Sequence, residues 1–308
     1  MPAIIEVREL TFDYPGLRAL DRVDMLIEAG SITALVGPNG AGKTTLMRCL
    51  CGLERPVLGR IVVADIDVIA APRHSHTKLG FLPDAGGLYD ALTVSQCLTY
   101  AAAANNLRAG LEQRVQETAA QLSLRDRLTQ RVGELSRGQR QRVAIGQAII
   151  HAPRVLILDE PATGLDPEAR QALAGLFRTL QQRGMTLLVS SHILAELADY
   201  ATHMLVLRQG RVIEQRALQG RSQVELQIEL LKDADAAAGW LAQRSEIAGV
   251  QCDGNTLRVT CAPEPSAQAA LLAALVNAGF SVLRFETAEP NLQQSYLDTL
   301  RTDSVSRT

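Results

Sequence analysis

The sequence lacks a surplus of charge of either sign, because 31 lysines and arginines stand against 33 aspartates and glutamates and leave a formal net charge of −2. A chain of this kind has no bulk basic field that would attract nucleic acid or an anionic lipid surface. We therefore expect no nucleic-acid partner.

Long apolar runs are absent as well. No stretch approaches the roughly 18 consecutive apolar residues that indicate a membrane-spanning helix, and the first six residues lack the basic and then apolar build of a secretory signal. The sequence thus predicts a chain that neither spans a membrane nor is exported by that route.

Cysteine is scarce, odd in number and scattered without C-x-x-C spacing. This distribution argues against a disulfide framework and against a zinc site. We expect reduced, mostly buried side chains of a cytosolic protein at Cys49, Cys51, Cys97, Cys252 and Cys261.

Two kinds of pattern divide the 308 residues, a length that is sufficient for two domains. Strand-like and helix-like segments alternate through residues 1–214, which is typical of an α/β domain. Inside it, residues of about 91–152 show only helical runs, which predicts an inserted helical subdomain. A polar linker over 215–223 leads to residues 224–300, whose order βαββαβ is that of a ferredoxin-like accessory domain, and 301–308 form a flexible tail.

The most specific motif lies between a buried strand over residues 31–36 and a helix over 44–51. It fits the pattern G-x-x-x-x-G-K-[ST], in which glycines let backbone N–H groups converge on phosphate oxygens beside the positive end of a helix dipole. Lys43 would bring a charge to the outer phosphates, and Thr44 a hydroxyl ligand to Mg²⁺. The predicted nucleotide loop consists of Gly37, Pro38, Asn39, Gly40, Ala41, Gly42, Lys43 and Thr44.

A second candidate site ends the apolar segment 155–158, where Asp159 and Glu160 stand side by side. Buried carboxylates need a cationic partner, and Mg²⁺ is the obvious one. Asp159 would hold the metal through its water shell, while Glu160, which points elsewhere, would polarise the water that attacks a γ-phosphate. The alternative is an apolar strand ending in solvated acids, which is common, but the phosphate loop upstream favours the metal.

Residues 135–139, LSRGQ, predict the start of a helix. Ser136 with Gln139 three residues later is a capping box, so Ser136 would begin a helix that runs to Ala152 and is stopped by Pro153. The free N–H groups and the dipole of this helix start make a second anion site that has no anion in its own chain. By itself the segment is also compatible with a simple helix cap.

Taken together, these motifs resemble the ATP-binding cassette of ABC transporters. Five of them occur in the family's order within residues 1 to about 214: the phosphate loop, 135–139, 159–161, 164–166 and 190–192. The resemblance implies an ABC-type P-loop NTPase core of class α/β with an inserted helical subdomain. It also implies binding of ATP and Mg²⁺ and hydrolysis of ATP.

The resemblance assigns roles to single residues. We call residues 135–139 the signature turn. In a head-to-tail dimer, the signature turn of one chain would clamp the γ-phosphate of ATP held on a second cassette, through Ser136, Gly138 and Gln139. Tyr14 stands where the family places an aromatic ring that stacks on adenine, and a simple strand tyrosine is the alternative. His192 resembles the histidine that contacts the γ-phosphate and orients Glu160, so catalysis would rest on Lys43, Glu160 and His192. Thr45 completes the nucleotide-binding set.

Two positions depart from the family's usual pattern. Most relatives have glutamine at the hinge between the α/β core and the helical subdomain, where this chain has Asp84. A carboxylate can accept from metal-bound water, which would place Asp84 beside Thr44 and Asp159 at the metal. An acid at this position is frequent in the branch that works with ABC-2 membrane subunits, so Asp84 is expected to mark that branch. Arg137 replaces the commoner second glycine of the signature, while Gly138 still permits close backbone approach.

The implied function is that of the ATPase subunit of an ABC-2 type exporter, peripheral on the cytoplasmic face of the inner membrane. Its partners would be membrane-spanning permease subunits and a second ATP-binding subunit, identical or homologous. Apolar and small residues of the helical subdomain would form the wall of a groove for a short helix of the membrane partner, or equally the subdomain's own core: Leu88, Tyr89, Leu92 and Ala101 to Ala104.

Two rival functions remain open from the sequence. One is a non-transport cassette ATPase on ribosomes or DNA, but such proteins usually have two cassettes in one chain, long coiled-coil or zinc insertions, or basic extensions. The other is a purely regulatory ATP-binding module, against which the complete set of Lys43, Asp159, Glu160 and His192 argues. The transported substrate is not indicated.

Overall fold

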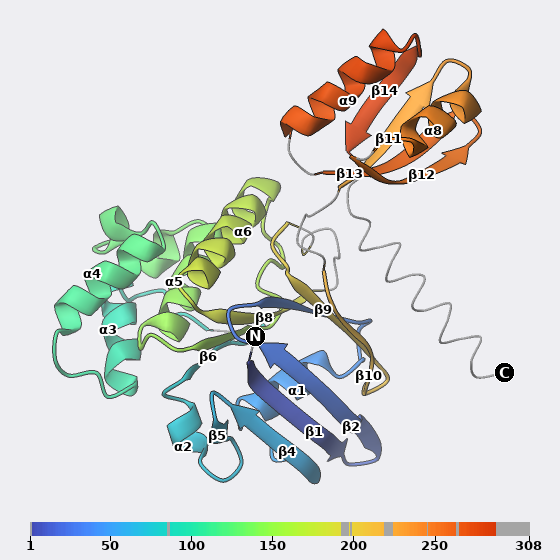
Figure 1. Cartoon of the computed structure of the whole chain (residues 1–308). Coiled ribbons are helices and arrows are strands. Elements are labelled where there is room, and N and C mark those ends of the chain that lie inside the picture. The colour runs from blue at the N-terminus through green and yellow to red at the C-terminus, as the bar shows by residue number, and fades with distance from the viewer. Residues whose placement is uncertain are drawn as a thin grey trace. The chain divides into compact units, whose positions relative to one another are not determined.

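The computed structural model describes residues 2–84, 87–191, 197, 199–218, 224–244, 246–262 and 265–287. Its contacts divide the chain into two compact units, one within Met1–Leu218 and the other within Gln219–Leu297 (Figure 1).

An antiparallel sheet opens the first unit, with strands in the order β2-β1-β4-β5. Alternate residues of β2, Val23, Met25 and Ile27 among them, are buried, so one face of this sheet packs on a core and the other faces outward. The strands are β1 (Ala3–Tyr14), β2 (Leu17–Glu28), β4 (Leu58–Val63) and β5 (Ile66–Asp67).

A six-stranded sheet carries the motifs, in the order β10-β9-β3-β8-β7-β6. All neighbours pair in parallel except β9 and β10, and every residue of β3, β7 and β8 is buried, as expected for strands covered on both faces. The carboxyl ends of β3, β8, β7 and β6 therefore meet at one edge. The strands are β3 (Ile32–Val36), β6 (Leu79–Leu82), β7 (Val155–Leu158), β8 (Thr186–Ser191), β9 (His203–Arg208) and β10 (Arg211–Ala217).

Helix α1 (Lys43–Leu50) lies at the centre of the main core. Its Leu46, Met47 and Leu50 are fully buried among side chains of β1, β2, β3 and β4, so the helix joins the two sheets. The short α2 (Pro72–Ser75) follows β5, and α6 (Pro167–Gln182) packs on β8. This packing fixes the start of α1 near the carboxyl end of β3, and residues 37–42 connect the two elements.

The predicted helical subdomain is formed by helices that contact one another: α3 (Val94–Ala104), α4 (Leu111–Gln121) and α5 (Arg137–Ile149), with short turns η1 (Arg125–Arg127) and η2 (Val132–Glu134) (Figure 1). Between residues 91 and 152, all of them described, the strand pairing amounts to one isolated bridge, Thr93 with Arg131. Ala101 and Ala102 are buried and belong to the subdomain's own core.

Helix α5 is shorter than the sequence predicts. It ends at Ile149 instead of Ala152, and Ala152 has a left-handed φ of 53°. Pro153 disfavours the helical region for the residue before it, so the end comes earlier than the proline itself.

The second unit confirms the predicted order βαββαβ. Its strands pair antiparallel in the order β12-β13-β11-β14, the arrangement of a ferredoxin-like module. Leu226, Ile228 and Leu230 alternate along β11 and are fully buried, so the strict alternation of that strand forms the core. The elements are β11 (Val224–Leu230), α8 (Ala234–Ala242), β12 (Ile247–Asp253), β13 (Thr256–Cys261), α9 (Pro265–Asn277) and β14 (Val282–Thr287).

The segment expected as a linker is partly strand, because β10 continues through Ala217. Residues 219–223 and the expected tail 301–308 lie outside the described residues.

The five cysteines are free, with Cys252 exposed and the other four buried. Burial raises the pKa of the Cys49 thiol to about 12.

Candidate active site

The phosphate loop connects β3 to α1 and has room only for glycine at two of its positions. A Cβ atom on Gly37 would lie 2.2 Å from the carbonyl oxygen of Leu207, and one on Gly42, whose φ is 104°, would lie 2.7 Å from the carbonyl oxygen of Ala19. No side chain caps α1, whose N-terminus follows Gly42. The loop is therefore a backbone cradle at a helix N-terminus, the arrangement that binds phosphate.

Lys43 extends its ammonium group back over this loop. The side chain is buried, and its Nζ donates to the carbonyl oxygen of Gly37 at 2.8 Å and lies 3.8 Å from Oε1 of Glu160. One cation thus stands between the loop that would cradle phosphates and the carboxylate that follows β7.

Asp159 accepts a hydroxyl hydrogen bond at each carboxylate oxygen. Thr44 Oγ1 donates to Oδ2 at 2.7 Å, and Ser190 Oγ, from the end of β8, donates to Oδ1 at 2.7 Å. Asp159 is almost completely buried. These bonds join the start of α1, the end of β7 and the end of β8 at the edge where the parallel strands terminate.

This donor set fits Mg²⁺ bound together with phosphates. The donors are oxygens only, which suits a hard cation, and among the described residues no cluster of three His, Cys, Asp or Glu side chains could hold a metal without further ligands. Mg²⁺ usually takes one or two carboxylates, water and substrate phosphates, so Thr44 and Asp159 beside the phosphate loop suffice.

Glu160 projects differently from its neighbour because its backbone is left-handed, with φ of 49°. Its N–H donates to Ser190 Oγ at 2.8 Å, and its Oε2 accepts from Thr163 Oγ1 at 3.4 Å. Together with the nearby Lys43, these contacts hold the carboxylate beside the phosphate loop, where a general base for attack on a terminal phosphate would be required.

Ser190 is a site residue whose role the sequence reasoning missed. It contacts both carboxylate residues, accepting from the Glu160 N–H and donating to Asp159. The available signal was a hydroxyl at the end of a buried strand, but its use depends on β8 lying between β3 and β7, which spacing alone does not indicate.

The capping box predicted for Ser136 and Gln139 is confirmed. The Gln139 N–H donates to Ser136 Oγ at 3.3 Å, and the Ser136 N–H donates to Gln139 Oε1 at 3.0 Å. A Cβ on Gly138 would come within 3.0 Å of the Cβ of Ala169, so the signature turn packs on the start of α6. Ser136 and Arg137 are exposed at this helix N-terminus, which is the position that a second anion site requires.

Tyr14 ends β1 beside the first turn of α1. Its hydroxyl lies 3.5 Å from Thr45 Oγ1, its ring meets Phe12 edge to face at 4.8 Å, and the residue is 39% exposed. An exposed ring next to the phosphate loop has the position that stacking on a nucleobase needs.

The remaining two predicted site residues, Asp84 and His192, follow the ends of two strands of the six-stranded sheet. Asp84 is exposed and follows β6, which pairs in parallel with β7 so that Leu82 lies opposite Leu158, next to Asp159. His192 comes directly after β8 and lies outside the described residues.

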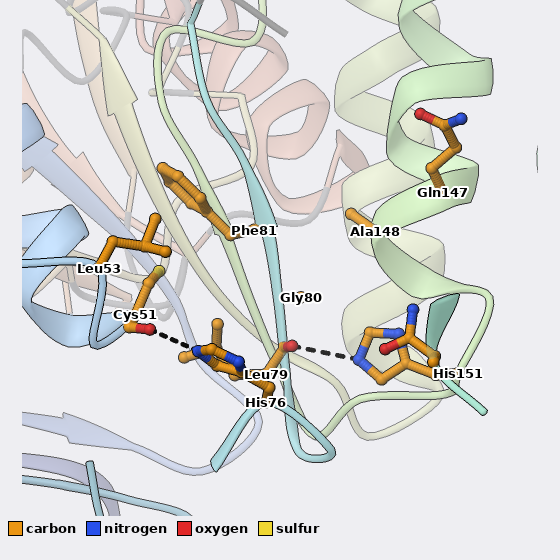
Figure 2. Close-up of a pocket in the computed structure, with 10 residues that line it drawn as sticks. Cys51, Leu53, His76, Leu79, Gly80, Phe81, Gln147, Ala148 and His151 are labelled. Carbon is orange, nitrogen blue, oxygen red and sulfur yellow. Dashed lines mark hydrogen bonds between the residues drawn. The ribbon is translucent and has the colours of Figure 1, made fainter. Parts of the chain in front are cut away.

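A hollow of about 270 Å³ opens between the α/β core and the helical subdomain, away from the phosphate loop. Figure 2 shows Leu53 and Phe81 on one side of β6 and Gln147 and Ala148 of α5 on the other. Two histidines that line it are held by hydrogen bonds. His76 Nε2 is hydrogen-bonded to the carbonyl oxygen of Cys51 at 2.8 Å, and His151 Nε2 is hydrogen-bonded to that of Leu79 at 3.1 Å.

A family model described as ABC transporter matches residues 20–163, which include the phosphate loop, the signature turn and Glu160. The SkfA peptide export ATP-binding protein SkfE of Bacillus subtilis (strain 168) is 33% identical over 217 residues, 68% of this chain and 88% of the relative. The Bacitracin transport ATP-binding protein BcrA of Bacillus licheniformis is 27% identical over 303 residues, 96% of this chain and 97% of the relative.

A third relative matches only in part. The Methionine import ATP-binding protein MetN 2 of Rhodococcus jostii (strain RHA1) is 37% identical over 204 residues, which are 64% of this chain and 60% of the relative. A solved structure of an ATP binding subunit of an ABC transporter superimposes with a TM-score of 0.63 at 31% identity, over 70% of this chain and 90% of that chain. No helix in the described part of the present structure is long and apolar enough to cross a membrane.

Proposed function

The chain belongs to the family of ABC transporter ATP-binding proteins, and we propose that it drives export as an ATP-bound dimer beneath separate membrane-spanning subunits. Members of this family are ATPases that generally dimerise and work with membrane permease subunits, and this chain is an ATPase of that kind. The observation that carries the proposal is the meeting of Lys43, Thr44, Asp159 and Glu160 at one sheet edge.

Within one chain, these residues would perform distinct tasks on ATP. The loop and Lys43 would hold the β- and γ-phosphates, while Thr44 and Asp159 would hold Mg²⁺, which neutralises phosphate charge when bound. Glu160 would accept a proton from the attacking water, and His192 would support the γ-phosphate. Asp84, exposed at the end of β6, would link the metal site to the membrane partner.

A second chain would complete the site. The signature turn presents an N-terminal helix dipole, and in a head-to-tail dimer Ser136, Gly138 and Gln139 would clamp the γ-phosphate held by the partner's loop. Binding of ATP would thereby close the dimer, and hydrolysis would open it.

Export is supported by the peptide export relative, which is 33% identical over 68% of this chain. The bacitracin transport relative spans 96% of the chain, accessory unit included. The hollow between core and helical subdomain, which the half-exposed Leu53 lines, would receive a short helix of the permease and hold the chain at the cytoplasmic face of the inner membrane. The residues expected to form the wall of this groove do not line the hollow: Leu88, Tyr89, Leu92 and Ala101 to Ala104. The accessory unit would have a regulatory or dimer-supporting role.

The Glu160→Gln variant tests this function. Because general-base catalysis contributes about 10² to 10⁴ in rate, the purified variant should lose that much ATPase and persist as an ATP-dependent dimer in light scattering. A Lys43→Ala substitution in the same background should abolish the dimer. Full ATPase in Glu160→Gln would remove Glu160 from its role, and a monomer in saturating ATP would contradict the closed dimer.

A further inference from the structure

Arg137 is the first residue of α5 and makes a specific contact with the loop between β7 and α6. One of its guanidinium nitrogens donates to the carbonyl oxygen of Thr163 at 3.0 Å. A cation at a helix N-terminus opposes the helix dipole and is unfavourable there. The contact with Thr163 gives this otherwise unfavourable side chain a defined position.

Gly164 is shaped to accept that guanidinium group. A Cβ on Gly164 would lie 2.3 Å from Cζ of Arg137, so the side chain of Arg137 occupies the space that any other residue would need. Gly164 also has a left-handed φ of 71°. The left-handed backbone favours glycine at this position, and the guanidinium group, the end of a flexible side chain, lies in the space beside it.

Thr163 connects this contact to the carboxylate of Glu160. Its hydroxyl donates to Glu160 Oε2 at 3.4 Å, and its N–H donates to the Glu160 carbonyl oxygen at 3.2 Å. The guanidinium group of Arg137 donates to the backbone carbonyl oxygen of the same Thr163. A continuous set of hydrogen bonds thus runs from the signature turn to Glu160 within one chain.

We propose that Arg137 is a positioning residue for Glu160: it ties the signature turn to the loop at Thr163 and Gly164 and so sets the orientation of the general base. The inference rests on the proposed function, because Glu160 must be that base. It deepens the function by giving the start of α5 two tasks, clamping the partner's nucleotide and fixing the geometry of its own chain's Glu160.

The alternative role for Arg137 is direct contact with a phosphate, since a cation beside a helix N-terminus attracts anions. The two roles differ in kinetics. A phosphate contact made in the ground state raises KM when it is lost, whereas poor orientation of a base lowers kcat and leaves KM unchanged.

The experiment measures steady-state MgATP hydrolysis by the purified full chain. Because the hydrogen bond from Arg137 to Thr163 is exposed, its loss should lower kcat of Arg137→Ala about three- to tenfold, with KM for ATP within about twofold. The kcat of Arg137→Lys should lie between those of the wild type and Arg137→Ala, because lysine keeps the charge but not the planar guanidinium group. The matched control is Arg140→Ala on the same helix, whose ion pair goes to Asp90 at 2.6 Å, and its kcat should stay within about twofold.

A double-mutant cycle then tests the route through Thr163. Thr163→Val keeps the carbonyl group and removes the hydroxyl that donates to Glu160, so the double variant with Arg137→Ala should be no slower than the slower single variant. Multiplicative losses, a raised KM at unchanged kcat, or equal rates in Arg137→Ala and Arg140→Ala would each overturn the positioning role.

The Glu160→Gln variant distinguishes failure of the proposed function from failure of this inference. A fully active Glu160→Gln would overturn the general base, and this inference with it. An inactive Glu160→Gln together with an unaffected Arg137→Ala would overturn the inference alone and leave the proposed function intact. Thermal unfolding of each variant shows whether a lost rate reflects a lost fold.

Discussion

Asp159 shows how a single buried carboxylate is tolerated at the end of an apolar strand. Its two oxygens accept from Thr44 and Ser190, which belong to other elements, and a hydrogen bond to a charged group typically contributes about 1.5–3 kcal/mol. The same Ser190 hydroxyl accepts from the Glu160 N–H. One small side chain therefore holds both acids in place.

Tyr14 offers a test at the level of one ring. If it stacks on adenine, Tyr14→Ala should raise KM for ATP about 5- to 160-fold, since base–aromatic stacking contributes about 1–3 kcal/mol. Tyr14→Phe should stay within about twofold of the wild type, because the hydroxyl contact with Thr45 is long at 3.5 Å. Steady-state kinetics with varied ATP measure both. An unchanged KM in Tyr14→Ala would refute stacking, and equal damage in Tyr14→Phe would assign the effect to the hydroxyl group.

Much of the site could be predicted residue by residue. Lys43 and Thr44 follow from a strand, loop and helix that are contiguous in sequence, and Asp159 and Glu160 from an apolar strand that ends in acids. The hydroxyl of Ser190 could not be assigned, because its partners depend on the order of strands in the sheet. The contact of Arg137 with Gly164 was equally hidden, since it joins the start of α5 to a loop residue 27 positions later that it meets only in the folded chain.

Two helices of the helical subdomain begin in the same way, and they form a matched pair. Thr93 and Gln96 cap α3 with a capping box, as Ser136 and Gln139 cap α5. We expect Thr93→Ala and Ser136→Ala each to lower the free energy of unfolding by about 1 kcal/mol. Only Ser136→Ala should also lower the ATPase rate, because only α5 would clamp a phosphate.

Urea titrations and steady-state ATPase assays measure the two effects separately. An equal loss of ATPase in both variants would mean that capping acts on activity through stability alone. A Ser136→Ala variant with wild-type ATPase would show that its hydroxyl has no part in the clamp.

The end of α5 contributes a pH dependence. Burial lowers the pKa of His151, which lies against β6 with Nε2 on the Leu79 carbonyl oxygen and Nδ1 buried without a partner. A group with a lowered pKa in the folded state adds stability above its unfolded pKa, near 6.5, and that stability is lost as the pH falls.

We therefore expect the urea midpoint of the wild type to fall between pH 7.5 and pH 5.5, and to fall less in His151→Gln. Because the two proteins differ only at position 151, the difference between them reports the loss of the His151 imidazole. An equal fall in both would contradict a buried neutral imidazole.

Elements were predicted well where the determinants are local. Both the capping box of α5 and the alternation of β11 are read from a few adjacent residues, and both are found in the structure. The end of α5 was misplaced because Pro153 acts on the conformation of the residue before it as well as on the hydrogen bond it lacks.

At the scale of the whole molecule, strand order was the feature that sequence could not supply. In the accessory unit, a local order βαββαβ matches one well-known sheet arrangement, so the topology followed from the pattern. In the first unit, β3 pairs with β8 and β9, strands more than 150 residues away, and such pairings leave no mark on local spacing. The proposed dimer would likewise depend on a surface that one chain cannot complete.

Complementation between two inactive variants tests the shared site most directly. Lys43→Ala disables the phosphate loop, and Ser136→Glu places charge and bulk at the signature turn, so neither homodimer contains a complete site. In a mixed dimer, the loop of one chain and the signature turn of the other are both intact. Because half of randomly mixed dimers are heterodimers with one complete site of two, an equimolar mixture should regain about a quarter of the wild-type ATPase rate. A mixture of folded variants that stays as inactive as its components, or a Ser136→Glu variant that is fully active alone, would contradict the shared site.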